Sequence, residues 1–174
     1  MDDEDYFKQY IRDVPDFPKK GIVFKDITPL LRDLGAFNKS ISKILERFSQ
    51  EEINIVACIE ARGFLLGSAL AYNLGAGLVP IRKVGKLPWE INKACYELEY
   101  GTDTLEIHKD AISPGQRVLL VDDVLATGGT AKAAIDIIGN MGGNIVCAAF
   151  LLELSELAGR KKTENTAVYS LIRY

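Results

Sequence analysis

Short apolar runs alternate with helical patterns along most of this chain, and this alternation limits the possible folds more than any other feature. The runs expected to be strands are residues 53–59, 77–81, 118–121, 145–152 and 166–172. The run 53–59 is nearly continuous and rich in β-branched residues, as in a strand buried on both faces. The spacing of apolar residues predicts helices at 38–48, 64–74 and 130–141. Strands and helices that alternate in this way are joined by right-handed crossovers. We therefore predict an α/β fold, a doubly wound, mostly parallel sheet flanked by helices.

Two stretches depart from this alternation. Residues 93–100 and 104–109 are short, partly alternating runs on either side of Gly101, a pattern that predicts a β-hairpin. We expect this hairpin to form a flexible flap over residues 82–109. Residues 1–36 are interrupted by prolines and are predicted to be an irregular arm, or hood, folded onto the core. Without repeats or a long linker, residues 1–174 fit a single domain.

Charge and cysteine content narrow the class of protein. The formal net charge of −3 gives no overall basic field to attract nucleic acid, so anions are expected to bind only at local sites. The three cysteines are scattered and form no metal-binding cluster, which favours reduced thiols. The chain begins with an acidic stretch rather than the basic start of a signal peptide, and it has no long apolar span. We expect a cytoplasmic protein that binds neither membrane nor nucleic acid.

The segment 117–130, RVLLVDDVLATGGT, carries the strongest chemical signal. It places Asp122 and Asp123 at the end of a buried strand, followed by a turn of small and hydroxyl residues and then a helix. Ligands of open α/β sheets bind beyond the carboxyl ends of the strands. Gly128 and Gly129 let the backbone bend tightly, so that N–H groups can converge on a phosphate at the helix N-terminus. The segment predicts a phosphate site beside two carboxylates.

Simpler interpretations of this segment explain less. A helix cap accounts for Thr127 or Thr130 but not for the acidic pair. Two like charges at the mouth of a buried strand repel each other unless a cation or a polyhydroxyl ligand lies there. Other phosphate motifs do not match: GxxxxGK[ST] is absent, and Gly75 and Gly77 precede a strand and lack the third glycine of a dinucleotide fingerprint.

The same segment resembles the motif by which type I phosphoribosyltransferases bind phosphoribosyl pyrophosphate (PRPP). Three further segments are similar to adenine phosphoribosyltransferases in particular: PDFPKKGIVFKDITP at 15–29, EARGF at 60–64, and IRKVGKLP at 81–88 with YELEYGT at 96–102. Their order and spacing match over nearly the whole chain. Lys20 departs from the pattern, which often has a second proline before the glycine. The resemblance implies a purine salvage enzyme that transfers the 5-phosphoribosyl group from PRPP to adenine, giving AMP and pyrophosphate.

The resemblance also implies roles for individual residues. The acidic pair, Asp122 and Asp123, would hold the ribose hydroxyls and the magnesium-bound substrate, and the 5′-phosphate would lie on Ala126, Thr127, Gly128, Gly129 and Thr130. The pyrophosphate would contact Glu60, Ala61, Arg62, Arg82, Lys83 and Lys86. The base would be read by Val23, Phe24 and Lys25, and the closing flap would bring Glu99 and Tyr100. The residues expected to act in catalysis are Glu99, Asp122, Asp123 and Arg62.

A cofactor and an assembly state follow from the same resemblance. Mg²⁺ would be held mainly through the substrate, with no dedicated protein cage, because this ion keeps most of its waters and favours phosphates plus one or two carboxylates. A homodimer is implied by analogy with the family alone. Loss of pyrophosphate builds positive charge on the ribose and negative charge on the leaving group, which carboxylates, Arg, Lys and Mg²⁺ stabilise.

Several of these residues also have ordinary interpretations. Phe24 and Tyr100 would be packing residues without the family match. Glu99 could lie on a solvated strand face, and Lys83 and Lys86 could be surface charge. Three rival functions remain: transfer to xanthine, hypoxanthine or orotate; a PRPP-sensing regulator that binds nucleic acid; and a purely structural domain. The segments at 15–29 and 60–64 argue against another base, the absence of a basic surface argues against the regulator, and the acidic pair argues against the structural domain.

Overall fold

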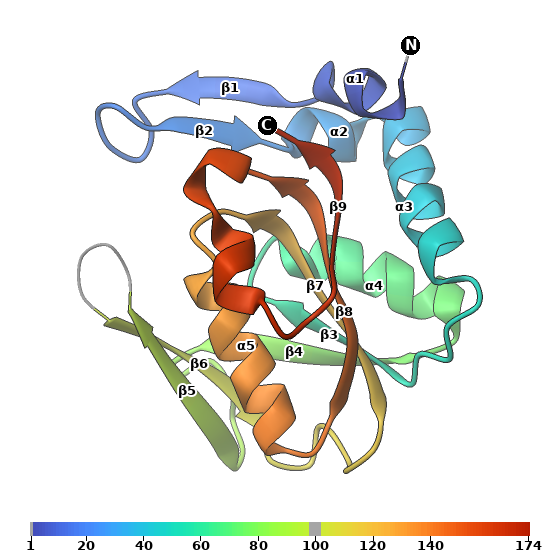
Figure 1. Cartoon of the computed structure of the whole chain (residues 1–174), viewed down its shortest axis with the longest axis vertical. Helices are drawn as coiled ribbons and strands as arrows, with labels where there is room; N and C mark the ends of the chain where they lie inside the picture. The colour runs from blue at the N-terminus through green and yellow to red at the C-terminus, as the bar shows by residue number, and fades with distance from the viewer. Residues whose placement is uncertain (1, 98–101) are drawn as a thin grey trace.

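A seven-stranded sheet forms the centre of the protein in the computed structural model, which describes residues 2–97 and 102–174 (Figure 1). The strand order is β5-β6-β4-β3-β7-β8-β9, and a separate two-stranded sheet pairs β1 with β2. The strands are β1 (Arg12–Pro15), β2 (Val23–Asp26), β3 (Ile55–Ile59), β4 (Gly77–Lys83), β5 (Ile91–Glu97), β6 (Thr102–His108), β7 (Arg117–Leu125), β8 (Asn144–Glu153) and β9 (Val168–Arg173). The helices are α1 (Asp3–Lys8), α2 (Thr28–Arg32), α3 (Leu34–Phe48), α4 (Gly63–Leu74) and α5 (Gly129–Asn140), with 3₁₀ turns η1 (Ser155–Leu157) and η2 (Gly159–Thr163).

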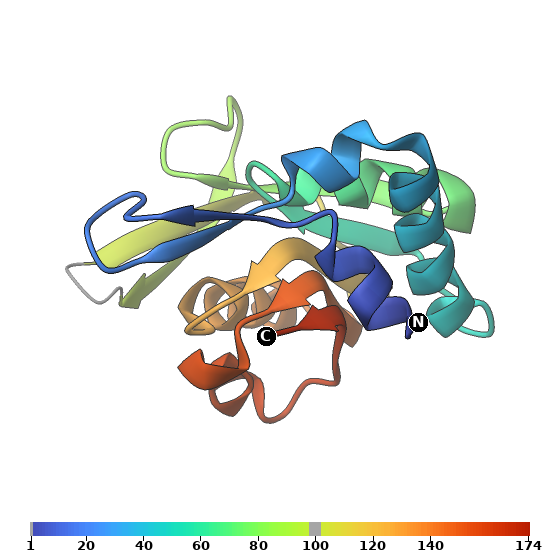
Figure 2. The same cartoon turned by 90° about the horizontal axis from the view of Figure 1, so that it is seen from above.

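The predicted doubly wound, mostly parallel sheet is confirmed. Neighbouring strands from β4 through β3, β7 and β8 to β9 run parallel, whereas β6 pairs antiparallel with both β4 and β5. Helices cover both faces, with α3 and α4 on one side and α5 on the other (Figures 1 and 2). All of the parallel strands therefore end at the same edge of the sheet, where ligands of such folds bind.

Strand β7 shows why the central strands read as continuous apolar runs. Leu119 and Val121 pack into the core beneath α3 and α4, whereas Val118 and Leu120 pack into the core beneath α5. Alternate side chains of a strand point to opposite faces, so a strand covered on both sides needs apolar residues at every position. The run ends where the chain reaches the edge of the sheet and turns polar.

The arm is more regular than the sequence predicted. Residues 1–36 were expected to be irregular, but they include α1, the β1–β2 hairpin and α2. Helix α3 also begins earlier than the predicted residue 38, because the Asp33 carboxylate accepts a hydrogen bond from the Ala36 N–H at 2.8 Å and caps the helix. Phe7 is fully buried and fixes α1 to the core. The hairpin lies beside the C-terminal end of the chain (Figure 1).

The predicted hairpin at the flap is confirmed in its strands. Strands β5 and β6 pair antiparallel from Ile91 opposite His108 to Glu97 opposite Thr102. Residues 98–101, which join them, lie outside the described residues. Both strands start two residues earlier than expected, because the prolines and glycines before them indicate a strand boundary only approximately.

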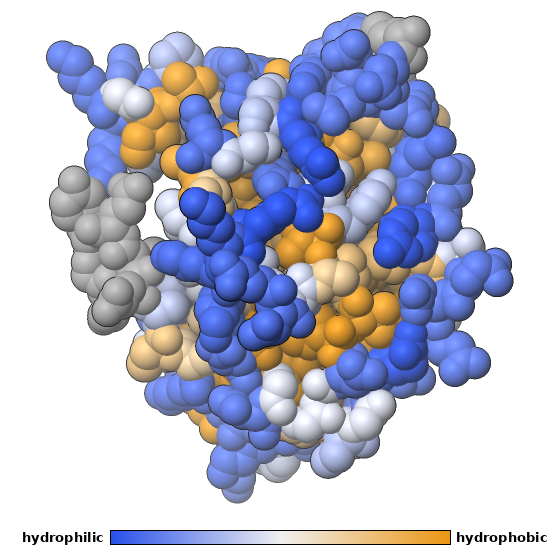
Figure 3. All heavy atoms as spheres, viewed as in Figure 1, coloured by the Kyte–Doolittle hydropathy of each residue, from blue (hydrophilic) through white to orange (hydrophobic). Residues whose placement is uncertain are grey.

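The surface seen in Figure 3 is largely hydrophilic, with apolar side chains showing in separate patches. Within the two described stretches, no helix is both long enough and apolar enough to cross a membrane.

Candidate active site

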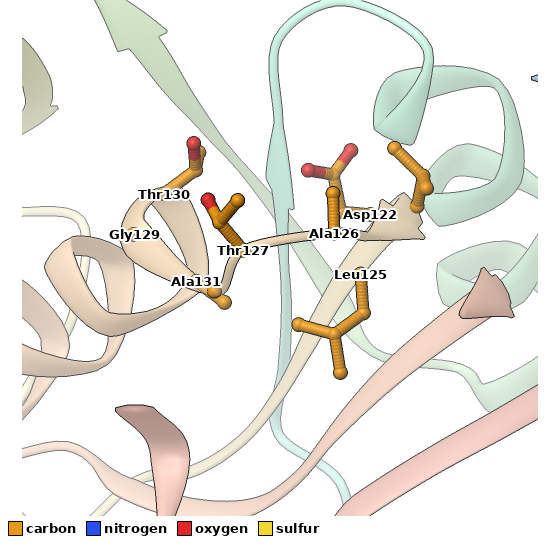
Figure 4. A pocket seen from close by; sticks show the side chains of 9 residues that line it. Asp122, Leu125, Ala126, Thr127, Gly129, Thr130 and Ala131 are labelled. Atoms are coloured by element: carbon orange, nitrogen blue, oxygen red, sulfur yellow. The ribbon is translucent and has the colours of Figure 1, made fainter. Parts of the chain in front are cut away.

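A small cavity lies where β7 passes into α5 at the C-terminal edge of the sheet. It has a volume of about 130 Å³ and is lined by Asp122, Val124, Leu125, Ala126, Thr127, Gly128, Gly129, Thr130 and Ala131 (Figure 4). Gly128 has φ +79° and stands immediately before the first residue of α5. This left-handed conformation favours glycine and turns the loop so that the N-terminus of α5 faces the cavity. The structure therefore brings together all five residues predicted to hold a phosphate.

The acidic pair lies next to this cavity. Asp122 is partly exposed and contributes to the cavity wall, whereas the Asp123 side chain is almost fully buried. Burial, followed by the negative charge of Asp123, raises the pKa of Asp122 well above its ordinary value. Burial also raises the pKa of Asp123, and the charge of Arg62 opposes that rise. The pair is thus a site where added positive charge is favourable.

Arg62 connects the acidic pair to the hood. Its Nε lies 2.8 Å from Oδ2 of Asp123, close enough for an ion pair, but the N–H does not point at this oxygen as a hydrogen bond requires. The guanidinium carbon lies 4.7 Å from the centre of the Phe24 ring, a cation–π distance. Gly63 follows at the start of α4, where a Cβ would lie 2.9 Å from the Asp122 carboxylate. The close approach of α4 to β7 therefore needs glycine at this position.

Glu60 and Arg82 form a second ion pair in the same region. Arg82 donates from Nε and Nη2 to the two carboxylate oxygens at 3.1 and 3.0 Å, and the Lys83 backbone N–H donates to Glu60 at 3.1 Å. Arg82 chiefly lowers the pKa of Glu60, so its carboxylate stays ionised. Arg82 also donates to the Lys86 carbonyl at 2.9 Å. Glu60 thus holds Arg82, and Arg82 holds the loop after β4.

The remaining predicted pyrophosphate residues are more exposed. The Lys83 ammonium lies 3.0 Å from Asp103 on β6, whose carboxylate also accepts a hydrogen bond from the Tyr96 hydroxyl at 3.1 Å. The Lys86 and Ala61 side chains are exposed at the same edge of the sheet. Glu99 and Tyr100, predicted for the closing flap, lie outside the described residues.

The three residues predicted to read a base do not all face one way. Phe24 faces Arg62, whereas the Lys25 ammonium lies 2.7 Å from Asp13 and 3.9 Å from the centre of the Tyr174 ring. Alternation along β2 sends Val23 to the same side as Lys25. That side opens into a cavity of about 520 Å³ lined by Asp13, Gly21, Ile22, Val23, Lys25, Leu154, Glu156, Leu157 and Tyr174.

Sequence reasoning missed the segment of η1 and η2, which lines the cavity beside β2 and packs against the loop 126–130. Leu157 lines the cavity of about 520 Å³ beside β2, and Gly159 packs against the backbone of Ala126 and Gly128. The signal was available, because this segment directly follows the carboxyl end of β8, the strand next to β7. It was overlooked because it has neither an acidic pair nor a glycine-rich turn.

Comparison with known proteins places this geometry in a family. The family model of the phosphoribosyl transferase domain matches residues 28–172. The adenine phosphoribosyltransferase of Trichlorobacter lovleyi is 57% identical over 96% of this chain and 98% of the relative. The solved adenine phosphoribosyltransferase of Thermoanaerobacter pseudethanolicus superposes with a TM-score of 0.95 at 53% identity, over 98% of this chain and 99% of that one. The Saccharomyces cerevisiae structure, a complex with an imino-altritol bisphosphate and adenine, has a TM-score of 0.91 at 42% identity, over 97% and 98%.

Proposed function

Because this chain belongs to the phosphoribosyltransferase family, and within it to the adenine phosphoribosyltransferases, we propose that it transfers the 5-phosphoribosyl group of PRPP to adenine. The products are AMP and pyrophosphate, and the reaction is one of purine salvage. One observation carries the proposal: a glycine-rich phosphate loop and two carboxylates lie beside an arginine that contacts an aromatic residue of the hood. In this arrangement the loop would hold the phosphate, the two carboxylates would hold the ribose, and the hood would lie against the base.

The acidic pair stabilises the sugar in this proposal. Departure of pyrophosphate leaves positive charge on the ribose ring, and a preorganised carboxylate favours that charge. Asp122 and Asp123 would bind the ribose hydroxyls while the loop 126–130 holds the 5′-phosphate. The depth of Asp123 supports this role, because a buried carboxylate acts on charge more strongly than a solvated one.

The cationic residues at the neighbouring strand ends would bind the leaving pyrophosphate. Arg62 and Arg82 are both partly exposed at this edge, and Glu60 holds Arg82 in one orientation rather than contacting an anion itself. Lys83 is paired with Asp103 and would exchange this partner for pyrophosphate, which carries more negative charge. Ala61 and Lys86 flank them.

Mg²⁺ fits the donors present. The partly exposed Asp122 and the negative potential of the acidic pair suit a cation that keeps most of its waters and binds substrate phosphates. When bound, the ion would neutralise charge on the leaving pyrophosphate.

The hood would recognise the base through the backbone of β2. This strand pairs with β1 along one edge only, so the N–H and C=O groups of its other edge have no strand partner among the described residues. Phe24 offers a ring face for stacking on the side of β2 that faces Arg62. Backbone groups at Val23 and Lys25 can accept from an exocyclic amine, and they leave the oxygen of hypoxanthine or guanine facing an acceptor.

The deciding experiment measures AMP formation from PRPP with adenine, hypoxanthine and guanine, each with and without Mg²⁺. We expect adenine to be preferred by roughly ten- to hundredfold, because one unpaired buried polar group costs about 1–3 kcal/mol. Equal turnover of hypoxanthine would contradict the assignment of the base, and turnover without Mg²⁺ would contradict the assignment of the metal.

A homodimer is the assembly that the exposed side chains support. Leu65 and Tyr72 are seven residues apart on α4, on one face of the helix, and are 51% and 87% exposed. A second copy would cover this face. Light scattering should give twice the chain mass for the native protein and a shift toward monomer for Tyr72→Lys, whereas Lys161→Glu on the exposed part of η2 serves as the control.

A further inference from the structure

The backbone of η2 contacts the backbone of residues 126–130, the phosphate loop. A Cβ on Gly159 would overlap the carbonyl oxygen of Ala126 and lie 3.1 Å from the nitrogen of Gly128. A Cβ on Gly128 would likewise overlap the carbonyl oxygen of Gly159. Gly159 is buried and, unlike Gly128, does not have a positive φ angle. Its lack of a side chain is therefore required by this contact and not by its own backbone conformation.

An ion pair fixes the residue that follows. Arg160 donates from Nε and Nη2 to the two oxygens of Glu153, both at 2.7 Å, and from Nη1 to the carbonyl of Val168 at 3.0 Å. Glu153 is the last residue of β8, with its side chain only 6% exposed, and Arg173 lies 3.8 Å away on β9. A planar guanidinium bound to a carboxylate by two hydrogen bonds leaves little rotational freedom. Arg160 is thus tied to the two strands at this edge of the sheet.

The turn before Gly159 indicates that the segment is held in place by its surroundings. Ala158 has φ +52°, a left-handed conformation that costs an L-residue roughly 1–2 kcal/mol. A chain held only by its own local preferences would relax away from this conformation. The contacts of Gly159 and Arg160, the two residues that follow Ala158, supply the restraint.

We propose that Gly159 and the Arg160–Glu153 ion pair are positioning residues for the transfer reaction, because they hold the loop 126–130 in the shape that binds the 5′-phosphate. The inference rests on the proposed function. It assigns to the segment after β8 a role at the phosphate, in addition to the cavity beside β2 that Leu157 of the same segment lines. Binding one phosphate by several backbone N–H groups depends on their alignment, so a small shift of Ala126 or Gly128 weakens all of them together.

The sharpest test compares ligands that differ only in the phosphate. Gly159→Ala should lower the affinity for AMP by about tenfold, the scale of one lost hydrogen bond to a charged group, and leave the affinity for adenosine nearly unchanged. In kinetics the KM for PRPP should rise while the KM for adenine stays within about twofold. Gly139→Ala is the matched control, since a Cβ there meets nothing within 4 Å. It should bind both ligands like the native protein.

Arg160→Lys provides a second variant if Gly159→Ala does not fold. This variant keeps the positive charge and Gly159 but loses the bidentate hydrogen bond to Glu153. We therefore expect a smaller loss of affinity, about threefold, again confined to AMP. Equal weakening of AMP and adenosine by folded variants would mean a general structural role, and unchanged AMP binding would mean that the contact does not matter; either overturns the inference. Failure of the native protein to bind AMP or form it would instead overturn the proposed function.

Discussion

The Nε atom of Arg62 lies 2.8 Å from Oδ2 of Asp123, so the start of α4 is joined to the end of β7 by opposite charges. The same guanidinium lies over Phe24 of the hood. One side chain thus contacts both the carboxylate assigned to the ribose and the ring assigned to the base. This relationship links the two halves of the proposed site, and each half can be tested separately.

Asp123→Asn should cut kcat by roughly 10²–10³-fold, the usual scale for losing one preorganised electrostatic partner. The fold should survive, because burial already disfavours the charge at this position and raises the pKa of Asp123. Steady-state kinetics together with circular dichroism check both points. Asp136→Asn on the exposed side of α5, where Asp136 pairs with Lys132, is the control. A folded Asp123→Asn protein with near-normal kcat would show that the PRPP site is misplaced.

Phe24→Leu should raise the KM for adenine by about tenfold, because stacking of a base on an aromatic ring contributes about 1–3 kcal/mol. The KM for PRPP should change less. Phe17→Leu is a suitable control, since Phe17 is an aromatic residue of the same arm that packs edge-on against Phe24 at 5.2 Å and is half exposed. Similar effects of the two substitutions would assign Phe24 to packing within the hood.

Glu99→Gln should lower kcat by about 10²–10⁴-fold, the range for a general acid or base, while the affinity for PRPP stays nearly unchanged. The prediction comes from the sequence, since Glu99 lies outside the described residues. Glu97→Gln, two residues earlier in the same predicted strand, is the comparison variant and should be mild. Hydrogen exchange of residues 82–109 with and without ligands tests the proposed closure of the flap; equal protection in the two states would rule it out.

The acid sensitivity of folding should depend on Glu153. Arg160 chiefly lowers the pKa of Glu153, with Arg173 adding a smaller effect, so the ionised carboxylate stabilises the folded state. This contribution is complete above the unfolded pKa of about 4.3 and is lost as pH falls through the lower folded pKa. Urea denaturation should show Glu153→Gln less stable than the native protein at pH 7, with the gap narrowing as the pH falls below about 4. A gap that does not change with pH would contradict this assignment.

Thiol labelling should distinguish the three cysteines. Burial raises the pKa of Cys58 to about 12 and also raises the pKa of Cys147, whereas Cys95 is exposed on β5. Only the thiolate reacts quickly, so a thiol reagent at pH 8 should label Cys95 in the native protein and all three residues after denaturation. Fast native labelling of Cys58 would indicate that the core between β3 and α4 opens.

Several parts of the fold and site could be predicted because they depend on residues close together in the chain. The apolar alternation of β7 and the glycines before α5 define a strand, a turn and a helix within 117–130, and the phosphate cavity forms from that one segment. The hairpin of β5 and β6 follows from local alternation in the same way. The structure of the arm was harder to predict from the sequence, because the capping of α3 by Asp33 and the burial of Phe7 depend on contacts that local periodicity does not describe.

By itself, the sequence determined the doubly wound sheet, the phosphate loop and the position of the two carboxylates at the end of a buried strand. Only the tertiary structure decided that Arg62 lies against Asp123, that Glu60 holds Arg82, and that Gly159 packs against the phosphate loop. The physical reason is that hydrophobic periodicity fixes which face of each element is buried, whereas the neighbours of a strand end depend on the order of strands in the sheet. Strand β8 lies beside β7 in that order, and this is what brings Gly159 to Gly128.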